Sequence, residues 1–170
     1  MDDALKEIDQ KDIDNLTELA KLQGVVYEQP LTKGYFLSMF EAEIKLLNKE
    51  VESGELKVLA DGSLIEKSDS NFYLQGGSTY DKSYWWGKKR YKSTAKAKVW
   101  SRDLKSVAHA NAAGAFLAGA VFGGVGSVPN GLTAVYLYNL ADKVDYRNGL
   151  NNRGIIATVT YDLVFTTASQ

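Results

Sequence analysis

The sequence contains few residues that could act as acids, bases or nucleophiles. It has no cysteine and a single histidine, His109, which excludes thiol chemistry, disulfide bonds and most transition-metal sites. His109 has apolar neighbours on an expected helix, so we predict a packed or interfacial residue rather than a catalyst. Paired carboxylates such as Glu41 and Glu43 fall on the solvated side of another expected helix. We therefore predict a protein that is not an enzyme and that uses no cofactor or metal.

Two other segments have the composition, but not the spacing, of known ligand sites. The glycine-rich "GAVFGGVGS", residues 119–127, lacks both the lysine of a phosphate-binding loop and the spacing of a dinucleotide fingerprint. The segment "DKVDYRNGLNN", residues 142–152, does not have the spacing of a calcium loop. Its Asn148-Gly149 pair instead predicts a turn.

The charges are segregated along the chain although the formal net charge is only −1. Residues 1–70 hold 16 acidic and 8 basic side chains, a net charge of −8. Residues 81–105 hold 2 acidic and 9 basic side chains, a net charge of +7, and residues 106–170 hold 3 of each. This segregation predicts a basic segment that meets an anionic partner.

Aromatic residues are interleaved with the basic ones in that segment. Near an anionic lipid surface each lysine or arginine contributes about 1 kcal/mol, and tryptophan and tyrosine favour the headgroup level. We therefore predict attachment to an anionic bacterial membrane through Trp85, Trp86, Lys88, Lys89, Arg90 and Trp100. Bases also stack on aromatic side chains beside cations, but the near-neutral charge and the lack of a nucleic-acid motif disfavour nucleic acid. A third interpretation places the tryptophans in the core and the lysines on a solvated face.

An uncharged tract of 36 residues, 106–141, follows the basic segment. Residues 106–128 could cross a bilayer as a helix, but they are rich in alanine and glycine, so we do not expect a permanent transmembrane span. Small residues recur every four positions, in the rows Ala110-Gly114-Ala118 and Ala115-Gly119-Gly123. Such rows allow close helix packing, so we assign Gly114, Gly119 and Gly123 to helix association and 107–128 to conditional insertion. The alternative is a buried helical hairpin in a soluble protein.

The periodicity of the chain predicts an α+β protein in three parts. Residues 1–54 form an acidic helical hairpin, and residues 55–80 form a connector with a short β-hairpin at Asp61-Gly62 and a possible strand at 72–74. In residues 81–170 a basic aromatic strand precedes an apolar helical hairpin, which begins at a Ser93-Thr94 N-cap. A C-terminal strand, in which apolar residues alternate over 155–166, is expected to pair with the aromatic strand.

The segments "YWWGKKRYKS" and "NNRGIIATVTYDLVF", with the Ala/Gly-rich hairpin between them, give the chain a family resemblance. Over residues 84–165 it resembles the C-terminal region of large secreted bacteriocins of Gram-positive bacteria, of the closticin and geobacillin type. The resemblance implies a secreted antibacterial toxin that acts without catalysis on the target membrane. It also implies a target-cell receptor or an immunity protein as further partners, and oligomers on membranes.

The N-terminal region has no counterpart in this resemblance. Its charge of −8 could hold the basic segment, of charge +7, away from lipid until it is displaced. Residues 1–25 are acidic and polar, without the pattern of a signal peptide, so we expect any such peptide to be absent from this chain. The alternative function is a soluble binding or structural module, at a cell surface or on a protein partner, whose apolar hairpin is only core.

Overall fold

The computed structural model of the chain describes residues 9–66, 77–110, 114–123 and 131–170, and it has the predicted α+β class. One antiparallel sheet carries six strands in the order in which they occur in the chain. The strands are β1 (Leu56–Val58), β2 (Leu64–Glu66), β3 (Tyr80–Tyr84), β4 (Gly87–Lys92), β5 (Ile155–Thr160) and β6 (Phe165–Ser169). The described helices are α2 (Gln10–Leu22), α3 (Lys33–Ser53), α4 (Thr94–His109), α5 (Gly114–Phe122) and α6 (Ala134–Leu150).

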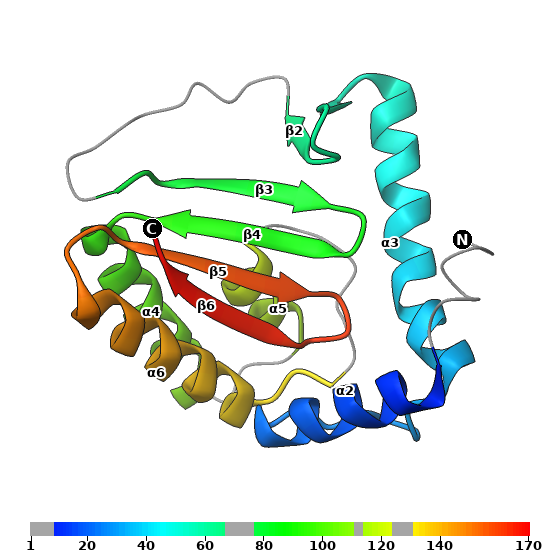
Figure 1. The fold of residues 1–170 in the computed structure, drawn as a ribbon, viewed down its shortest axis with the longest axis horizontal. Helices are drawn as coiled ribbons and strands as arrows, with labels where there is room; N and C mark the ends of the chain where they lie inside the picture. The colour runs from blue at the N-terminus through cyan, green and yellow to red at the C-terminus, as the bar shows by residue number, and fades with distance from the viewer. Residues whose placement is uncertain (1–8, 67–76, 111–113, 124–130) are drawn as a thin grey trace.

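The helices lie behind the sheet and beside two of its margins, and they leave its front face uncovered (Figure 1). Helices α4, α5 and α6 lie behind the sheet, and α2 runs below its β6 edge. Helix α3 stands beside the end of the sheet where the β3–β4 and β5–β6 turns lie. The two N-terminal helices thus form an L rather than lying side by side.

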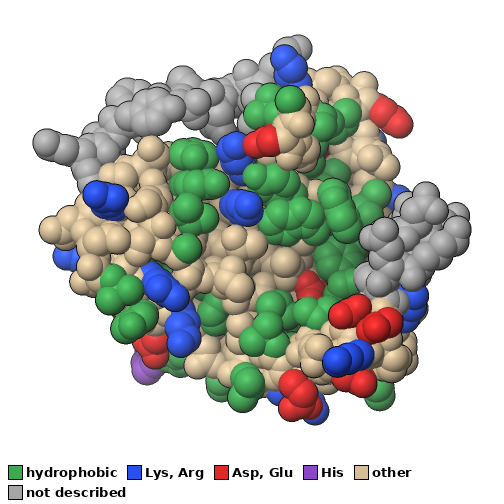
Figure 2. Space-filling model, viewed as in Figure 1, with side chains coloured by type: hydrophobic (Ala, Val, Ile, Leu, Met, Phe, Trp, Pro, Cys, Tyr) green, Lys and Arg blue, Asp and Glu red, His purple; other side chains and the backbone are tan. Residues whose placement is uncertain are grey.

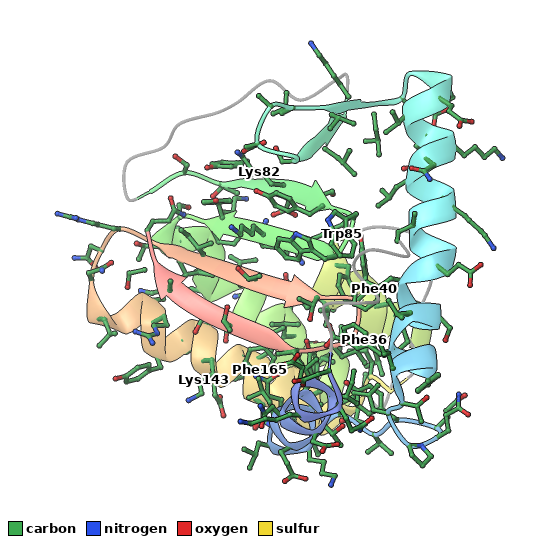
Figure 3. The ribbon with its side chains drawn as sticks, turned by 45° about the vertical axis from the view of Figure 1, so that its right-hand side comes forward. Phe36, Phe40, Lys82, Trp85, Lys143 and Phe165 are labelled. Carbon is green, nitrogen blue, oxygen red and sulfur yellow. The ribbon has the colours of Figure 1, made fainter. Side chains whose placement is uncertain are left out.

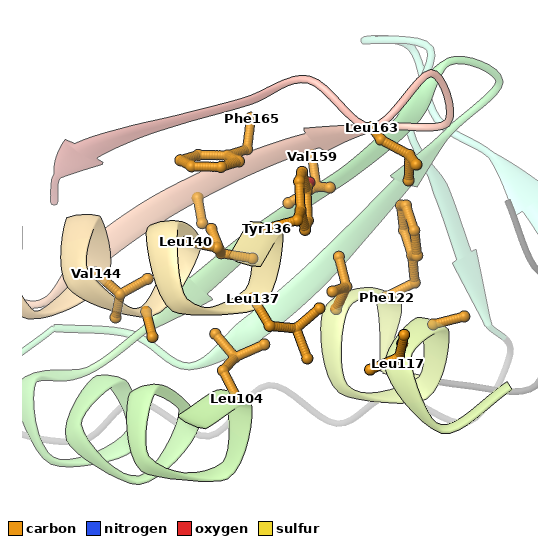
Figure 4. Packing of buried hydrophobic residues seen from close by; sticks show 14 of the residues in the cluster. Leu104, Leu117, Phe122, Tyr136, Leu137, Leu140, Val144, Val159, Leu163 and Phe165 are labelled. Carbon is orange, nitrogen blue, oxygen red and sulfur yellow. The ribbon is translucent and has the colours of Figure 1, made fainter. Parts of the chain in front are cut away.

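The core lies between the sheet and the α4–α6 layer (Figure 4). Leu104, Leu137 and Val144 are fully buried there. Ile155, Ala157 and Val159 of β5 are also fully buried, whereas the residues between them are half-buried. The alternation in the sequence therefore identified the strand face that packs on the helices.

The connector and the N-terminal helices are tied to the C-terminal unit. The predicted hairpin at Asp61-Gly62 forms between β1 and β2, and it joins the main sheet through the pairing of Leu64 with Ser83. At the end of α2 the amide of Gln23 donates to the Phe165 carbonyl at 2.8 Å and accepts from its N–H at 2.9 Å. These bonds satisfy backbone groups at the edge of the sheet. The possible strand at 72–74 lies outside the described residues.

Two predicted single strands are hairpins. The aromatic strand turns at Trp85-Trp86, which join β3 to β4 with Tyr84 opposite Gly87. A Cβ on Gly87 would collide with the Val159 carbonyl of β5, so glycine is required where the two strands approach. The C-terminal strand also folds back after Thr160 into β6. The predicted pairing of the two regions is correct, since β4 pairs with β5 along its whole length.

The predicted first helix of the apolar hairpin is divided. Helix α4 begins at the expected N-cap, where the Ser93 side chain accepts from the Lys96 N–H, and it ends at His109. Helix α5 has only nine residues. The row Ala110-Gly114-Ala118 therefore does not lie on one continuous helix, and residues 111–113 and 124–130 of the tract lie outside the described residues. None of the described helices combines the length and apolar composition needed to cross a bilayer.

Candidate functional site

The described residues hold no cluster suited to metal binding, because no three His, Asp or Glu side chains converge in residues 9–66, 77–110, 114–123 and 131–170. His109 is exposed at the last residue of α4. The side of the sheet opposite α4–α6 is the strongest candidate for a binding surface.

No helix covers this face in the described part of the molecule, and we call it the open face (Figure 2). The strand register places on it Tyr80, Lys82, Tyr84, Lys89, Tyr91, Ile156, Thr158, Thr160 and Thr166. Tyr80 stacks on Tyr91 with ring centroids 4.2 Å apart, and Tyr84 stacks on Trp86 at 4.7 Å. One side of each ring is thus already covered by its partner.

An apolar cleft of about 500 Å³ opens at the end of the open face, between α3 and the two turns (Figure 3). It is lined by Leu16 of α2, by Phe36, Leu37, Phe40 and Ile44 of α3, and by Trp85, Trp86, Thr160, Asp162 and Val164. Phe36 and Phe40 lie one helical turn apart, so both rings face the same side of α3. Trp85, at the tip of the β3–β4 turn, is 51% exposed although its ring lies 6.2 Å from that of Phe40. A large apolar opening of this kind is the usual form of a binding site.

Asp162 is the one carboxylate among the residues that line the apolar cleft, and it is only 3% exposed. Burial raises the pKa of its carboxyl group above the ordinary value, and a hydrogen bond with Thr160 offsets only part of this effect. The Tyr27 hydroxyl donates to the Asp162 carbonyl at 2.6 Å, which fixes the β5–β6 turn against the N-terminal region. The environment thus favours a neutral carboxyl group at this wall of the cleft.

Arg90 points away from the open face, toward α5. Its Nη1 donates to the carbonyls of Ala120 and Val121 at 3.1 and 2.7 Å. The guanidinium carbon lies 4.6 Å from the ring centre of Trp100, whose Nε1 donates to Ala120 at 2.8 Å. These donors satisfy carbonyl groups in the last turn of α5, which have no partner within the helix.

Asp81 completes this buried cluster from β3. Its carboxylate lies 3.2 Å from Arg90 Nε and 2.8 Å from Lys92 Nζ. Burial lowers the pKa of Arg90, while Asp81 acts in the opposite direction. Arg90 thus joins α5 to the sheet and Trp100 joins α5 to α4, and neither residue is part of the exposed surface around Trp85.

The remaining predicted attachment residues lie on different sides of the β3–β4 hairpin. Trp85 is exposed, Trp86 is half-buried, and Lys89 lies on the open face with its Nζ 5.5 and 5.9 Å from the rings of Tyr84 and Trp86. Lys88 is half-buried on the opposite side of β4 by strand alternation. The structure therefore brings Trp85, Trp86 and Lys89 together, apart from Arg90 and Trp100.

The three glycines assigned to helix association have different surroundings. A Cβ on Gly119 would meet nothing within 4 Å, so no helix among the described residues packs closely there. Gly123 follows α5 with φ +74°, and a Cβ on it would lie 2.6 Å from Arg90 Nη2. Gly123 is thus required by its left-handed backbone and by Arg90. Gly114 is the first residue of α5, and its surroundings lie outside the description.

Sequence reasoning missed the cleft and the role of Asp81. The helical period identified Phe36 and Phe40 as one face of a helix, but nothing local indicated that this face meets Trp85 and Asp162. Comparisons with protein-family models, with curated proteins and with solved structures found no match. The resemblance to bacteriocins therefore stays a prediction.

Proposed function

We propose that the protein is a secreted, bacteriocin-like antibacterial protein that acts without catalysis at the anionic membrane of its target cell. The observation that carries this proposal is the exposed Trp85 at the tip of the β3–β4 turn, next to the apolar cleft and to Lys89. An indole at the end of a rigid hairpin can enter the headgroup layer without unfolding of the protein. Secretion and bacterial targets rest on the sequence resemblance.

Attachment would involve the cations around this turn. Lys89 makes cation–π contacts, and in the described part of the chain no carboxylate pairs with it. Lys82, on the same face, is partly neutralised by Asp61 at 2.9 Å. Lys88 is near the tip as well, but it lies on the opposite side of β4. At about 1 kcal/mol for each cation near an anionic surface, Lys82, Lys89 and Trp85 together support reversible binding.

Insertion of residues 107–128 would be a later step. Leu117, Val121 and Phe122 of α5 are buried in the core, and Arg90 and Trp100 bind its last turn. Insertion therefore requires release of α5 from these partners. We propose that attachment through Trp85 comes first and that the bonds from Arg90 oppose release.

Restraint by the acidic N-terminal region would depend on apolar contact rather than charge. Phe40 of α3 lies against Trp85, whereas within the described ranges no ion pair joins residues 9–54 to residues 81–105. Attraction between the charges of residues 9–54 and those of the basic segment thus acts at long range, where salt screens it. Asp61 of the connector, by contrast, pairs directly with Lys82 at 2.9 Å. Displacement of α3 would uncover the apolar cleft.

The second candidate function is a soluble binding module. It is favoured by the burial of Leu117, Val121, Leu137 and Leu140, because these residues of the uncharged tract form the core of the folded protein. Such a module would use the open face or the apolar cleft for a protein partner.

Binding to vesicles separates the two candidates. We expect the full chain to sediment with phosphatidylglycerol-containing vesicles at low salt and to bind phosphatidylcholine vesicles more weakly. Half-burial of one large apolar side chain corresponds to about 1–1.5 kcal/mol, so Trp85→Ala should weaken partitioning roughly five- to tenfold. Tyr146→Ala is the matched control, since Tyr146 is 61% exposed on α6.

Growth inhibition of Gram-positive bacteria and vesicle leakage should fall in parallel in the Trp85 variant. Equal partitioning of the Trp85 and Tyr146 variants would contradict attachment through the turn. No binding to anionic vesicles at any salt concentration or pH would leave the soluble binding module as the better interpretation.

A further inference from the structure

The lining of the apolar cleft limits the ligands that it can take. Apart from Thr160 and Asp162, every residue of the lining has an aliphatic or aromatic side chain. The Thr160 hydroxyl already donates to the Val164 carbonyl at 2.8 Å. A polar ligand would lose its hydration in such a site without gaining hydrogen bonds, which disfavours binding. The cleft therefore suits the apolar body of a ligand, and its volume lies within the roughly 300–1,000 Å³ typical of small-molecule sites.

The charges near the cleft differ between its interior and its rim. Inside, burial raises the pKa of Asp162 and so disfavours its charged form. At the rim, Lys89 Nζ lies 5.9 Å from the centre of the Trp86 ring, which lines the cleft. Lysines elsewhere in the described chain, such as Lys92 and Lys105, form ion pairs at 2.8 and 2.9 Å. Lys89 has no such pair there, and it is placed to meet an anionic group at the mouth of the cleft.

We infer that the apolar cleft binds a single long acyl chain whose anionic headgroup lies at Lys89. This inference deepens the proposed function and rests on it, because an anionic membrane supplies such chains. The aromatic side chains of Phe36, Phe40 and Trp85 contact the chain, and the headgroup remains in water beside Trp86. The same chemistry is present in a free fatty acid and in an anionic phospholipid, so the test needs both.

The first measurement uses fatty acids in solution, below the concentration at which they aggregate. Displacement of fluorescent cis-parinaric acid from the full chain should show one saturable site. Each methylene group buried contributes about 0.8 kcal/mol, so affinity should rise up to about fourfold per methylene from decanoate onward. The rise should stop at the chain length that fills the cleft.

Matched substitutions locate the site. Leu37→Trp fills the cleft and should lower affinity at least about tenfold, whereas Leu46→Trp, on the same helix but outside the lining, should not. If Leu37→Trp unfolds by circular dichroism, Ile44→Phe serves instead. Lys89→Glu should weaken binding of the fatty-acid carboxylate but not of the fatty alcohol with the same chain length. Lys143 is exposed on α6, far from the lining in sequence (Figure 3), and Lys143→Glu should change neither affinity.

Phosphatidylglycerol vesicles form the second arm of the test. If Leu37→Trp weakens both vesicle and fatty-acid binding, the cleft takes a membrane acyl chain, as inferred. If fatty acids bind but vesicles do not, the cleft site stands for a free amphiphile and the proposed membrane function fails. If vesicles bind but no fatty acid does, or if Leu37→Trp and Leu46→Trp bind fatty acids equally, the cleft inference is overturned.

Discussion

Replacing Arg90 by methionine should remove the connection between α5 and the sheet while keeping most of the side-chain volume. The substitution deletes the bonds to the carbonyls of Ala120 and Val121 and the ion pair with Asp81. It also removes the charge 4.6 Å from the Trp100 ring. Arg90 is only 7% exposed, so water cannot easily replace these interactions.

The expected loss in the free energy of unfolding depends on which partners of Arg90 keep another hydrogen bond or ion pair. A hydrogen bond from a charged group contributes roughly 1.5–3 kcal/mol. Ala120 retains the bond from Trp100, and Asp81 retains Lys92. The unpaired carbonyl is then that of Val121, and the total loss should be about 3 kcal/mol rather than the upper limit of about 5 kcal/mol for breaking a buried pair.

Urea unfolding followed by circular dichroism measures this loss, with Arg102→Met as the control. Arg102 is exposed on α4, and its replacement should change the free energy of unfolding by less than about 0.5 kcal/mol. In Arg90→Met the melting temperature should fall by roughly 6–12 °C, and amide exchange in residues 114–123 should accelerate. A loss below about 1 kcal/mol, or unchanged exchange in α5, would refute the role of Arg90.

Three further predictions concern the glycines of the α5 segment, the buried carboxyl group of Asp162 and the buried hydroxyl group of Tyr136. Gly119→Ala should stabilise the protein by up to about 1 kcal/mol, because the new Cβ would meet open space inside a helix. Gly123→Ala should destabilise it, because Gly123 has a φ of +74° and its Cβ would contact Arg90. Thermal melting of both variants checks this, and a loss of stability in Gly119→Ala would indicate a helix contact at that position. Burial raises the pKa of Asp162 above 3.8, so the folded state binds the proton more tightly than the unfolded chain, and stability is lost as pH rises from about 4 through the raised pKa. Asp162→Asn should therefore gain stability relative to the wild type between pH 4 and pH 7 in urea titrations, and an equal difference at both pH values would contradict this. The Tyr136 hydroxyl is fully buried and has no hydrogen-bond partner in the described chain, so Tyr136→Phe should be neutral or stabilising by about 1 kcal/mol, and a clear loss in chemical denaturation would show that the hydroxyl has a partner.

Much of the fold could be predicted because local signals agreed with it. Apolar alternation marked β5, the Asp61-Gly62 pair marked the first hairpin, and Ser93 marked the start of α4. The turn between β3 and β4 was missed for a physical reason. Aromatic residues favour strands, so Trp85-Trp86 read as strand, although the pairing of Tyr84 with Gly87 makes them a turn.

The candidate site was only partly predictable. The sequence showed that Trp85, Trp86 and Lys89 lie close together along the chain, and the structure keeps them together. The sequence could not show that residues 36–44 of α3, which precede Trp85 by more than 40 positions, supply the opposite wall of the apolar cleft. Contacts between distant segments depend on how elements pack, and neither period nor composition records that packing.

Charge segregation, the lack of cysteine and the alternation of β5 are properties of the sequence alone, and they determined the α+β class and the absence of thiol chemistry. The roles of adjacent cations were decided only by the tertiary structure. Lys89 and Arg90 are neighbours in the chain, yet one lies on the open face and the other binds α5 inside the protein. Successive side chains of a strand point to opposite faces, and only the packing of α4–α6 on one of those faces decides which cation is buried.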